Sequence, residues 1–288
     1  MTRTILLTDI DNTLYDWGAF FAPSFRAMVH ALVRELELSE EQLYGEFKKV
    51  FACHGSLDYA FLIQELDSVK TLSVEDVKHL IRAGRGAFLS VQRKHLRPYP
   101  GVSETLKWLL KQNVAVIGVT NSPIHRAQKR LFDLNLDSLL TGLVAWEGFE
   151  GDLDPATEGY IPASRQRTRT RLARSIPVPL SACKPCQEHY AIALKAFGGA
   201  SSDAWAIGDS LSKDLRPAAS LGVKTIWARY GATFDTEHRD ASTLLKITHW
   251  SESEIQTTYS TDAFQPDYAV DSIAELKDII PTMALTLF

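Results

Sequence analysis

Short runs of apolar and β-branched residues, each followed by a polar cluster, constrain the fold of this chain most. Thr4–Thr8 runs into two acids, Val114–Thr120 into an asparagine, and Ala204–Ile207 into a Gly-Asp pair. Unbroken apolar runs of this length are typical of parallel strands that are buried on both faces. Further candidate strands are Lys224–Ala228, Tyr268–Val270 and, with a weaker pattern, Leu139–Trp146.

Helical patterns separate these runs. Ser122 can cap a helix that continues to Leu131, and the helical pattern of Lys184–Phe197 stops at a Gly-Gly pair. Strands that alternate with helices predict an α/β fold with a Rossmann-like parallel sheet and helices on both faces. Chemistry gathers at the carboxyl ends of the strands in such sheets. The polar groups expected there are Asp9 with Asp11, Thr120 with Asn121, Lys184, and Asp209 with Asp214.

Residues 17–97 have a helical pattern with almost no strand signal. Two segments that resemble capping boxes begin at Ser39 and Ser73, and the sequence RPYPG at 97–101 marks the return to the sheet. We therefore expect 17–97 to be an α-helical cap domain inserted into a catalytic core of residues 1–16 and 98–288. A helical module placed just after the first strand would cover the site as a lid.

Residues 143–183 form a second insertion, within the core. An acidic block is followed by a basic block with five arginines between 165 and 174, and proline and glycine are scattered through both. This composition predicts an extended surface excursion. The arginines could bind polyanions, although neutralisation by the nearby acids is the favoured interpretation.

Length, composition and charge exclude several classes of protein. A length of 288 residues corresponds to about two domains. The net charge of −4 argues against a nucleic-acid partner. No stretch of 18 uncharged apolar residues occurs, and acids interrupt the first apolar run, so we expect neither a membrane span nor a signal peptide. Three cysteines suit a reducing compartment, and we expect a cytoplasmic protein whose oligomeric state the sequence does not define.

The sequence Asp9-Ile10-Asp11-Asn12-Thr13 carries the sharpest chemical signal. Two carboxylates near the end of a strand can face one pocket, where one attacks phosphorus and the other protonates the leaving oxygen and later activates water. A solvated pair of acids before a turn is the simpler alternative. Asp209 and Asp214 follow another strand at a spacing that can hold a hard cation such as Mg²⁺, although Asp214 could instead anchor a helix.

Two weaker signals accompany these acids. A hydroxyl and free N–H groups at Thr120 and Asn121 can bind phosphate oxygens, although Ser122 alone explains a helix cap there. Lys184 opens a helix, where a cation opposes the helix dipole, so a partnership with acids or phosphate explains it better.

Taken together, DxDxT, Thr120, Lys184 and GDxxxxD, in this order, resemble the haloacid dehalogenase (HAD) superfamily of phosphohydrolases. The resemblance covers about 4–14 and 98–280, and the insert matches the family's helical cap. It implies a Mg²⁺-dependent hydrolase that removes phosphate from a small phosphorylated metabolite through an aspartyl-phosphate.

The resemblance also implies a role for each matched residue. Asp9 would be the nucleophile and Asp11 the general acid/base, and Lys184 would neutralise the charge of the nucleophile and the phosphate. Phosphate would be bound by Thr120, Asn121 and Lys184. The metal ligands would be Asp9, the backbone carbonyl of Asp11, and Asp209, supported by Thr13 and Asp214.

The sequence separates branches of this family. Asp11 favours a phosphatase over a haloacid dehalogenase, which has no leaving alcohol to protonate. The segments DIDNTLYD and 54–59 look most like a nucleotidase-like branch, in which Tyr15 and His54 are candidate substrate contacts. The aromatic cluster that includes Tyr15 could stack on a base or simply pack the hinge. A phosphomutase, a dehalogenase and a noncatalytic phosphate-binding protein remain alternatives.

One departure concerns the lysine. The gap from Thr120 to Lys184 is much longer than the family's, so Lys195 and Lys213 are substitute candidates. Lys184 also lies inside a CxxC sequence, Cys183 to Cys186, for which chance is the favoured explanation and redox control of Lys184 the alternative.

Overall fold

The computed structural model describes residues 3–59, 61–148, 169–232, 241–248 and 264–280. Within them, seven strands form one parallel sheet in the order β4-β3-β2-β1-β5-β6-β7. This topology confirms the predicted α/β, Rossmann-like fold. The strands are β1 (Ile5–Thr8), β2 (Ala115–Pro123), β3 (Gly142–Trp146), β4 (Ser175–Val178), β5 (Ala204–Gly208), β6 (Lys224–Ala228) and β7 (Tyr268–Val270).

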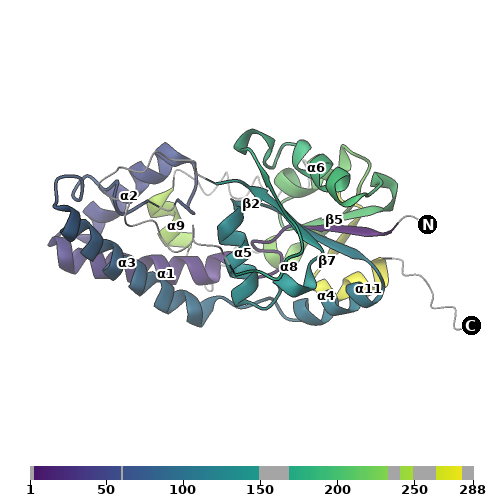
Figure 1. Cartoon of the computed structure of the whole chain (residues 1–288), viewed down its shortest axis with the longest axis horizontal. Helices are drawn as coiled ribbons and strands as arrows, with labels where there is room; N and C mark the ends of the chain where they lie inside the picture. Colours follow the sequence, from purple (N-terminus) through teal and green to yellow (C-terminus); the bar gives the residue numbers. More distant parts are fainter. Residues whose placement is uncertain (1–2, 60, 149–168, 233–240, 249–263, 281–288) are drawn as a thin grey trace, which may run out of the picture.

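Alternate residues of β1 enter two different cores because successive side chains of a strand point to opposite faces. Leu6 packs in the core that contains the apolar sides of α4 (Val102–Lys111), α5 (Ile124–Asp133) and α11 (Leu276–Ile279). Ile5 and Leu7 pack in the other core, with α6 (Glu188–Phe197) and α7 (Arg216–Ala219). In Figure 1 the sheet accordingly lies between α6 on one side and α4 with α11 on the other.

Three long helices lie between β1 and α4, away from the sheet (Figure 1): α1 (Trp17–Leu36), α2 (Glu40–His54) and α3 (Val74–His95). We call them the cap helices. Ser39 and Gln42 form a reciprocal capping box at the start of α2, and the Ser73 hydroxyl accepts from the backbone N–H of Asp76 at the start of α3. Side chains at these two positions therefore set the helix starts that their sequences indicate.

After β6 the chain forms a further helix, α9 (Ala241–Ile247), which packs against the cap helices α2 and α1 (Figure 1). Leu244 and Ile247 of α9 are buried, and the Lys246 ammonium lies 5.4 Å from the centre of the Tyr44 ring. We expected 98–288 to belong wholly to the core. The apolar i, i+3 pair of α9 is instead buried against the cap helices. The segment 98–288 therefore contributes to the packing of the cap helices as well as to the core.

The expected surface excursion at 143–183 also differs from the structure at both ends. Most of β3 and all of β4 fall inside this range, because their apolar residues extend the sheet beyond β2. Arg171, from the basic block, pairs with the buried Asp137 at 2.7 Å. Arg165, Arg167 and most of the acids lie outside the described residues.

The remaining short elements are η1 (Asp137–Leu139), η3 (Leu180–Ala182), η4 (Ser201–Asp203), η5 (Leu211–Leu215), α8 (Arg229–Ala232) and η7 (Ile273–Glu275). No helix in the described part of the chain has the length and apolar character needed to cross a membrane.

Candidate active site

Asp9 follows the last residue of β1, at the carboxyl edge of the central strand. Its backbone N–H donates to the carbonyl of Ile207 at 2.9 Å, which continues the pairing with β5. The chain then turns at Asn12, whose φ of 59° lies in the left-handed region. This turn brings the Thr13 hydroxyl back to Asp9, where it donates to Oδ2 at 3.0 Å. The DxDxT spacing thus fixes one oxygen of the Asp9 carboxylate.

Lys184 reaches the same point across the long sequence gap. Its Nζ donates to Oδ1 of Asp9 and, at 2.6 Å, to Oδ1 of Asp214. Asn121 holds the lysine backbone from both sides: its Nδ2 donates to the Lys184 carbonyl at 2.7 Å, and its Oδ1 accepts from the Lys184 N–H at 2.9 Å. In the structure Asn121 therefore positions Lys184, a role the sequence did not suggest. Lys195 is exposed on α6, and Lys213 lies in η5.

The electrostatics of this pair follow from its burial. Asp9 and Lys184 are both nearly inaccessible to solvent. Burial raises the pKa of Asp9 to about 7, and the Asp214 charge adds to that effect while Lys184 opposes it. Burial lowers the pKa of Lys184, but the carboxylates of Asp214 and Asp9 outweigh it and hold that pKa well above its usual value. The lysine is thus a permanent cation at neutral pH.

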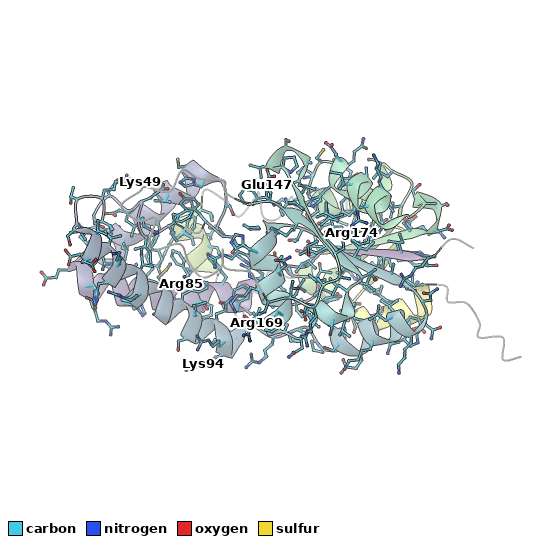
Figure 2. The ribbon with its side chains drawn as sticks, viewed as in Figure 1. Lys49, Arg85, Lys94, Glu147, Arg169 and Arg174 are labelled. Atoms are coloured by element: carbon cyan, nitrogen blue, oxygen red, sulfur yellow. The ribbon has the colours of Figure 1, made fainter. Side chains whose placement is uncertain are left out.

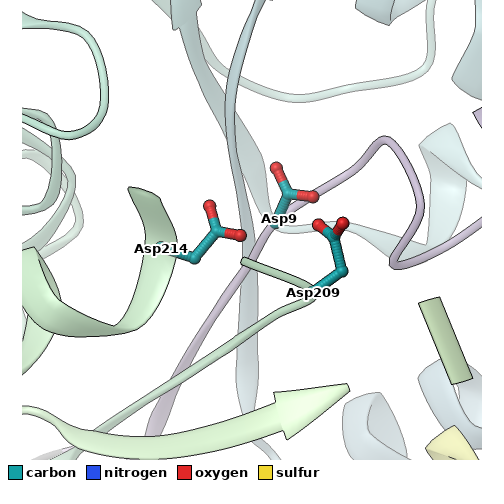
Figure 3. Close-up of side chains that lie close together, drawn as sticks. All are labelled: Asp9, Asp209 and Asp214. Atoms are coloured by element: carbon teal, nitrogen blue, oxygen red, sulfur yellow. The ribbon is translucent and has the colours of Figure 1, made fainter. Parts of the chain in front are cut away.

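Asp9, Asp209 and Asp214 form a buried carboxylate triad (Figure 3), with one oxygen from each lying within 4.8 Å of the others. Asp209 directly follows β5, and the backbone N–H of Ser210 donates to Oδ2 of Asp214 at 2.9 Å. Three carboxylates against the single charge of Lys184 leave a local excess of two negative charges when all are ionised. Oxygen-only donors and this excess suit a hard divalent cation such as Mg²⁺. The triad contains Asp214, which the spacing of the two acids made a candidate cation ligand and the family resemblance made a supporting residue.

The Asp11 side chain lies in a second cluster rather than in the triad. Its Oδ1 accepts from the Tyr15 hydroxyl at 2.6 Å and from Nη1 of Arg130 at 3.2 Å. Its Oδ2 accepts from the Ser122 hydroxyl at 2.7 Å and, weakly, from Thr120 at 3.5 Å. Thr120 and Asp11 are thus brought together as predicted from the strand ends, with a Ser122 contact the sequence did not indicate.

Asp58 joins this second cluster from the loop that follows α2. Its Oδ1 accepts from Nη2 of Arg130, and its Oδ2 accepts from the Ser122 hydroxyl at 3.1 Å. Arg130 is almost wholly buried on α5, and its guanidinium also lies 5.3 Å from the centre of the Phe20 ring of α1. Arg130, Asp58 and Ser122 therefore connect the cap helices to the carboxyl edge of the sheet.

A sequence signal for Arg130 was available. Helical spacing from the buried Ala127 and Leu131 places Arg130 on the apolar side of α5, where a cation needs an acidic partner. Asp58 offers no comparable signal, because nothing in its loop sequence indicates which part of the core it meets.

The two candidate substrate contacts have other partners. Tyr15 is fully buried, and burial together with the Asp11 charge holds the pKa of its hydroxyl well above the usual value. His54 stacks on Tyr59 with ring centres 3.6 Å apart, and its Nε2 lies 2.6 Å from Oε2 of Glu65. Both residues thus make contacts within the protein.

Residues of β6 and α8 contact the segments that carry the site acids. The Trp227 indole N–H donates to the Asp209 carbonyl at 2.9 Å, and the Tyr230 hydroxyl donates to the Thr13 carbonyl at 2.9 Å. A Cβ on Gly231 would lie 1.8 Å from the Asn12 carbonyl oxygen. Only glycine allows this approach of α8 to the loop that carries Asp9 and Asp11.

The CxxC cysteines are free thiols. Cys183 is buried, and burial raises the pKa of its thiol to about 11 although Lys184 opposes this. A thiol with so high a pKa is a poor nucleophile, which disfavours redox control of Lys184.

Comparison with known proteins agrees with this geometry. The sequence profile of haloacid dehalogenase-like hydrolases matches residues 4–222, and a second profile of HAD-like hydrolases matches 181–276. A glyceraldehyde 3-phosphate phosphatase of Methanopyrus kandleri is 23% identical over 285 residues, which cover 97% of this chain and 97% of that protein. The pyrophosphatase PpaX of Halalkalibacterium halodurans is 23% identical over 284 residues, or 99% of this chain and 100% of that protein.

A solved structure shares the fold. YfnB of Bacillus subtilis, assigned to the HAD hydrolases and solved bound to magnesium, superposes with a TM-score of 0.53 at 16% identity, covering 97% of this chain and 99% of that one. The matching profile spans most of the chain, from β1 to beyond the acids after β5. This chain therefore belongs to the haloacid dehalogenase-like hydrolases and is an enzyme of that family.

Proposed function

We propose that this enzyme is a phosphatase that hydrolyses a small phosphomonoester through an aspartyl-phosphate on Asp9. The observation that carries the proposal is the position of Lys184 between Asp9 and Asp214, with Asp209 completing the carboxylate triad. Phosphoryl transfer depends on positioning and on neutralisation of spread negative charge, and these residues are suited to both. The names of the two relatives, a glyceraldehyde 3-phosphate phosphatase and a pyrophosphatase, agree with hydrolysis that releases phosphate.

Asp9 supplies the nucleophile in this proposal. One oxygen is oriented by the Thr13 hydroxyl and the other by Lys184, so the carboxylate is held in a fixed direction for attack on phosphorus. Attack forms the Asp9–phosphorus bond and breaks the bond from phosphorus to the leaving oxygen. In this proposal Lys184 offsets the charge of the transferred group, and the Thr120 hydroxyl donates to a phosphoryl oxygen.

Asp11 is the proposed general acid and base. It lies two residues beyond Asp9 and meets the hydroxyls of Tyr15 and Ser122. It gives its proton to the leaving oxygen, then takes a proton from the water that attacks the acyl phosphate. This second step separates a phosphatase from a phosphomutase, which returns the phosphoryl group to a sugar.

Mg²⁺ is the proposed metal, held by Asp9, Asp209 and the backbone carbonyl of Asp11, with Asp214 as the further carboxylate of the triad. When bound, it supplies positive charge that allows a nucleophile and a phosphate dianion to approach each other. The buried excess of negative charge around Lys184 supports this assignment.

We also propose that residues 17–97 act as a cap domain. Asp58 is the cap residue that meets the core cluster through Arg130 and Ser122. Closure of the cap would exclude bulk water while admitting the hydrolytic water.

The three free thiols suit the cytoplasmic location expected from the sequence.

The test is release of inorganic phosphate from p-nitrophenyl phosphate with Mg²⁺. We expect Asp9→Asn to abolish release while leaving the far-ultraviolet circular dichroism unchanged, and EDTA to abolish it reversibly. Asp278→Asn, on an exposed position of α11, is the matched control and should retain activity. Full activity of Asp9→Asn would refute the nucleophile. Turnover of sugar phosphates without release of inorganic phosphate would favour a mutase.

A further inference from the structure

Arg126 is a partly buried cationic residue that the proposed reaction does not use. It lies in the first turn of α5, one turn before Arg130, and its Nε is buried without a hydrogen-bond partner among the described residues. Buried polar atoms of this kind are rare, because each loses its contacts to water without replacing them. An unpartnered guanidinium nitrogen beside a candidate active site therefore calls for a ligand.

The local helix gives no reason for an arginine at this position. A cation in the first turn opposes the helix dipole. Arg126 and Arg130 are also like charges at i and i+4, which repel each other. Both effects destabilise α5, so Arg126 is placed against the preferences of its own helix.

Asp58, the acid that attracts Arg126, makes its hydrogen bonds with other residues. Asp58 attracts both Arg126 and Arg130, but its Oδ1 accepts from Arg130 and its Oδ2 from the Ser122 hydroxyl. Arg85, from the cap helix α3 (Figure 2), adds a third positive charge that repels Arg126. Among the described groups of this cluster, three arginines face two acids, Asp58 and Asp11.

The position of Arg126 relative to the reacting groups identifies what it could bind. The Ser122 hydroxyl oxygen lies 2.7 Å from Oδ2 of Asp11 and 3.1 Å from Oδ2 of Asp58, so this one side chain connects Asp58 to the proposed general acid. In the proposed reaction Asp11 protonates the leaving oxygen, so the remainder of the substrate would lie beyond Asp11, away from Asp9. Arg126 is one helical turn from Arg130, which contacts both Asp11 and Asp58.

We propose that Arg126, assisted by Arg85, binds a second anionic group on the leaving portion of the substrate. This inference rests on the proposed phosphatase function and narrows its substrate class to phosphomonoesters that carry a carboxylate or a second phosphate. A guanidinium presents a planar fork of donors that matches either group. The ligand would satisfy the buried Nε and balance the excess of positive charge in the cluster.

The test compares matched pairs of esters. The first pair is 2-phosphoglycolate and 2-hydroxyethyl phosphate, which differ in the terminal carboxylate. The second pair is ethane-1,2-diol bisphosphate and 2-hydroxyethyl phosphate, which differ in the second phosphate. We expect kcat/KM to favour the anionic ester by about ten- to hundredfold, as hydrogen bonds to charged groups imply, with the difference in KM. The pair that shows the larger preference distinguishes a carboxylate from a phosphate.

Variants of Arg126 decide the assignment. Arg126→Gln should bring the ratio of the two kcat/KM values close to one, and Arg126→Lys should keep part of the preference because it keeps the charge without the fork. Lys129→Gln, on an exposed position of the same helix, is the matched control and should keep the wild-type ratio. Equal rates on both esters in the wild type, or an unchanged ratio in Arg126→Gln and Arg126→Lys, would overturn the proposal.

Binding separates this inference from the proposed chemistry. Isothermal titration of the Asp9→Asn protein should give a lower Kd for 2-phosphoglycolate than for 2-hydroxyethyl phosphate, and the difference should disappear in Asp9→Asn/Arg126→Gln. A preference that survives without any hydrolysis by the wild type would support the subsite and reject the phosphatase. Hydrolysis of both esters with equal Kd would do the reverse.

Discussion

The ammonium nitrogen of Lys184 lies 2.6 Å from Oδ1 of Asp214, and both groups are buried beside Asp9. One cation therefore holds two acids together at the carboxyl edge of the sheet. Since the third acid, Asp209, lies within reach of the same point, the stability of this arrangement without metal depends on Lys184.

Lys184→Met should destabilise the metal-free protein by about 3 kcal/mol or more, because removal of one partner leaves buried charges uncompensated. Added Mg²⁺ should recover part of the loss by mass action on the folded state. Thermal unfolding in EDTA and in Mg²⁺ measures both effects. Lys195→Met, on an exposed position of α6, is the control and should unfold with the wild type. A Lys184→Met protein as stable as wild type in EDTA would contradict the burial argument.

Asp9→Asn should stabilise the metal-free protein at pH 8. The pKa of Asp9 is raised from 3.8 to about 7 by burial, so the folded state binds its proton more tightly than the unfolded state. That contribution is complete below about pH 4 and is lost as the pH rises through 7. The increase in the free energy of unfolding caused by Asp9→Asn should therefore grow between pH 4 and 7 and then level off.

Urea unfolding in EDTA at several pH values checks this prediction for Asp9. The control is Asp278→Asn, on an exposed position of α11. A constant difference between wild type and Asp9→Asn would show that the ionisation of Asp9 is not coupled to folding.

His189 should make the protein sensitive to acid. It is fully buried on α6, and burial together with the nearby Lys184 charge lowers its pKa from 6.5 to about 3. Below pH 6.5 the unfolded state takes up a proton that the folded state refuses, so stability falls as the pH drops toward 3. The slope approaches about 1.4 kcal/mol per pH unit for one such group.

His189→Gln should remove this part of the acid sensitivity. The unfolding free energies of wild type and variant, measured from pH 7 to 4, should converge or cross as the pH falls. His95→Gln, on an exposed position of α3, is the control. Parallel curves for wild type and His189→Gln would exclude the titration of His189 as a source of acid sensitivity.

Local sequence patterns predicted the sheet and the gathering of polar residues at its edge. β1, β2 and β5 are continuous apolar runs, and their carboxyl ends must meet at one edge when the strands are parallel. Asp9 and Asp209 meet for this reason. A continuous apolar run predicts a strand well because few other structures bury all of its side chains, whereas a parallel strand is buried on both faces.

Contacts between distant segments were not predictable in this way. Nothing local indicates that α9 packs on the cap helices, because an apolar i, i+3 pair fits any apolar surface. Asp58 meets Arg130 across 72 positions, and Asn121 holds the Lys184 backbone across 63. Each pairing depends on how loops fold back over the sheet edge, which the chain's own periodicity does not encode.

Gly231→Ala tests whether α8 sets the geometry of Asp9. A Cβ at 231 would lie 1.8 Å from the Asn12 carbonyl oxygen and 3.1 Å from the Asp209 Cβ, so either α8 or the loop after β1 must shift. We expect a loss of both stability and phosphatase activity, with the larger fractional loss in kcat. Gly45→Ala in α2, where a Cβ meets nothing within 4 Å, should instead stabilise the protein by about 0.5–1 kcal/mol through helix propensity and leave kcat unchanged. Steady-state kinetics and thermal unfolding of the two variants separate these expectations. Wild-type kcat in Gly231→Ala would show that the Asn12 turn tolerates displacement and that α8 does not position the nucleophile.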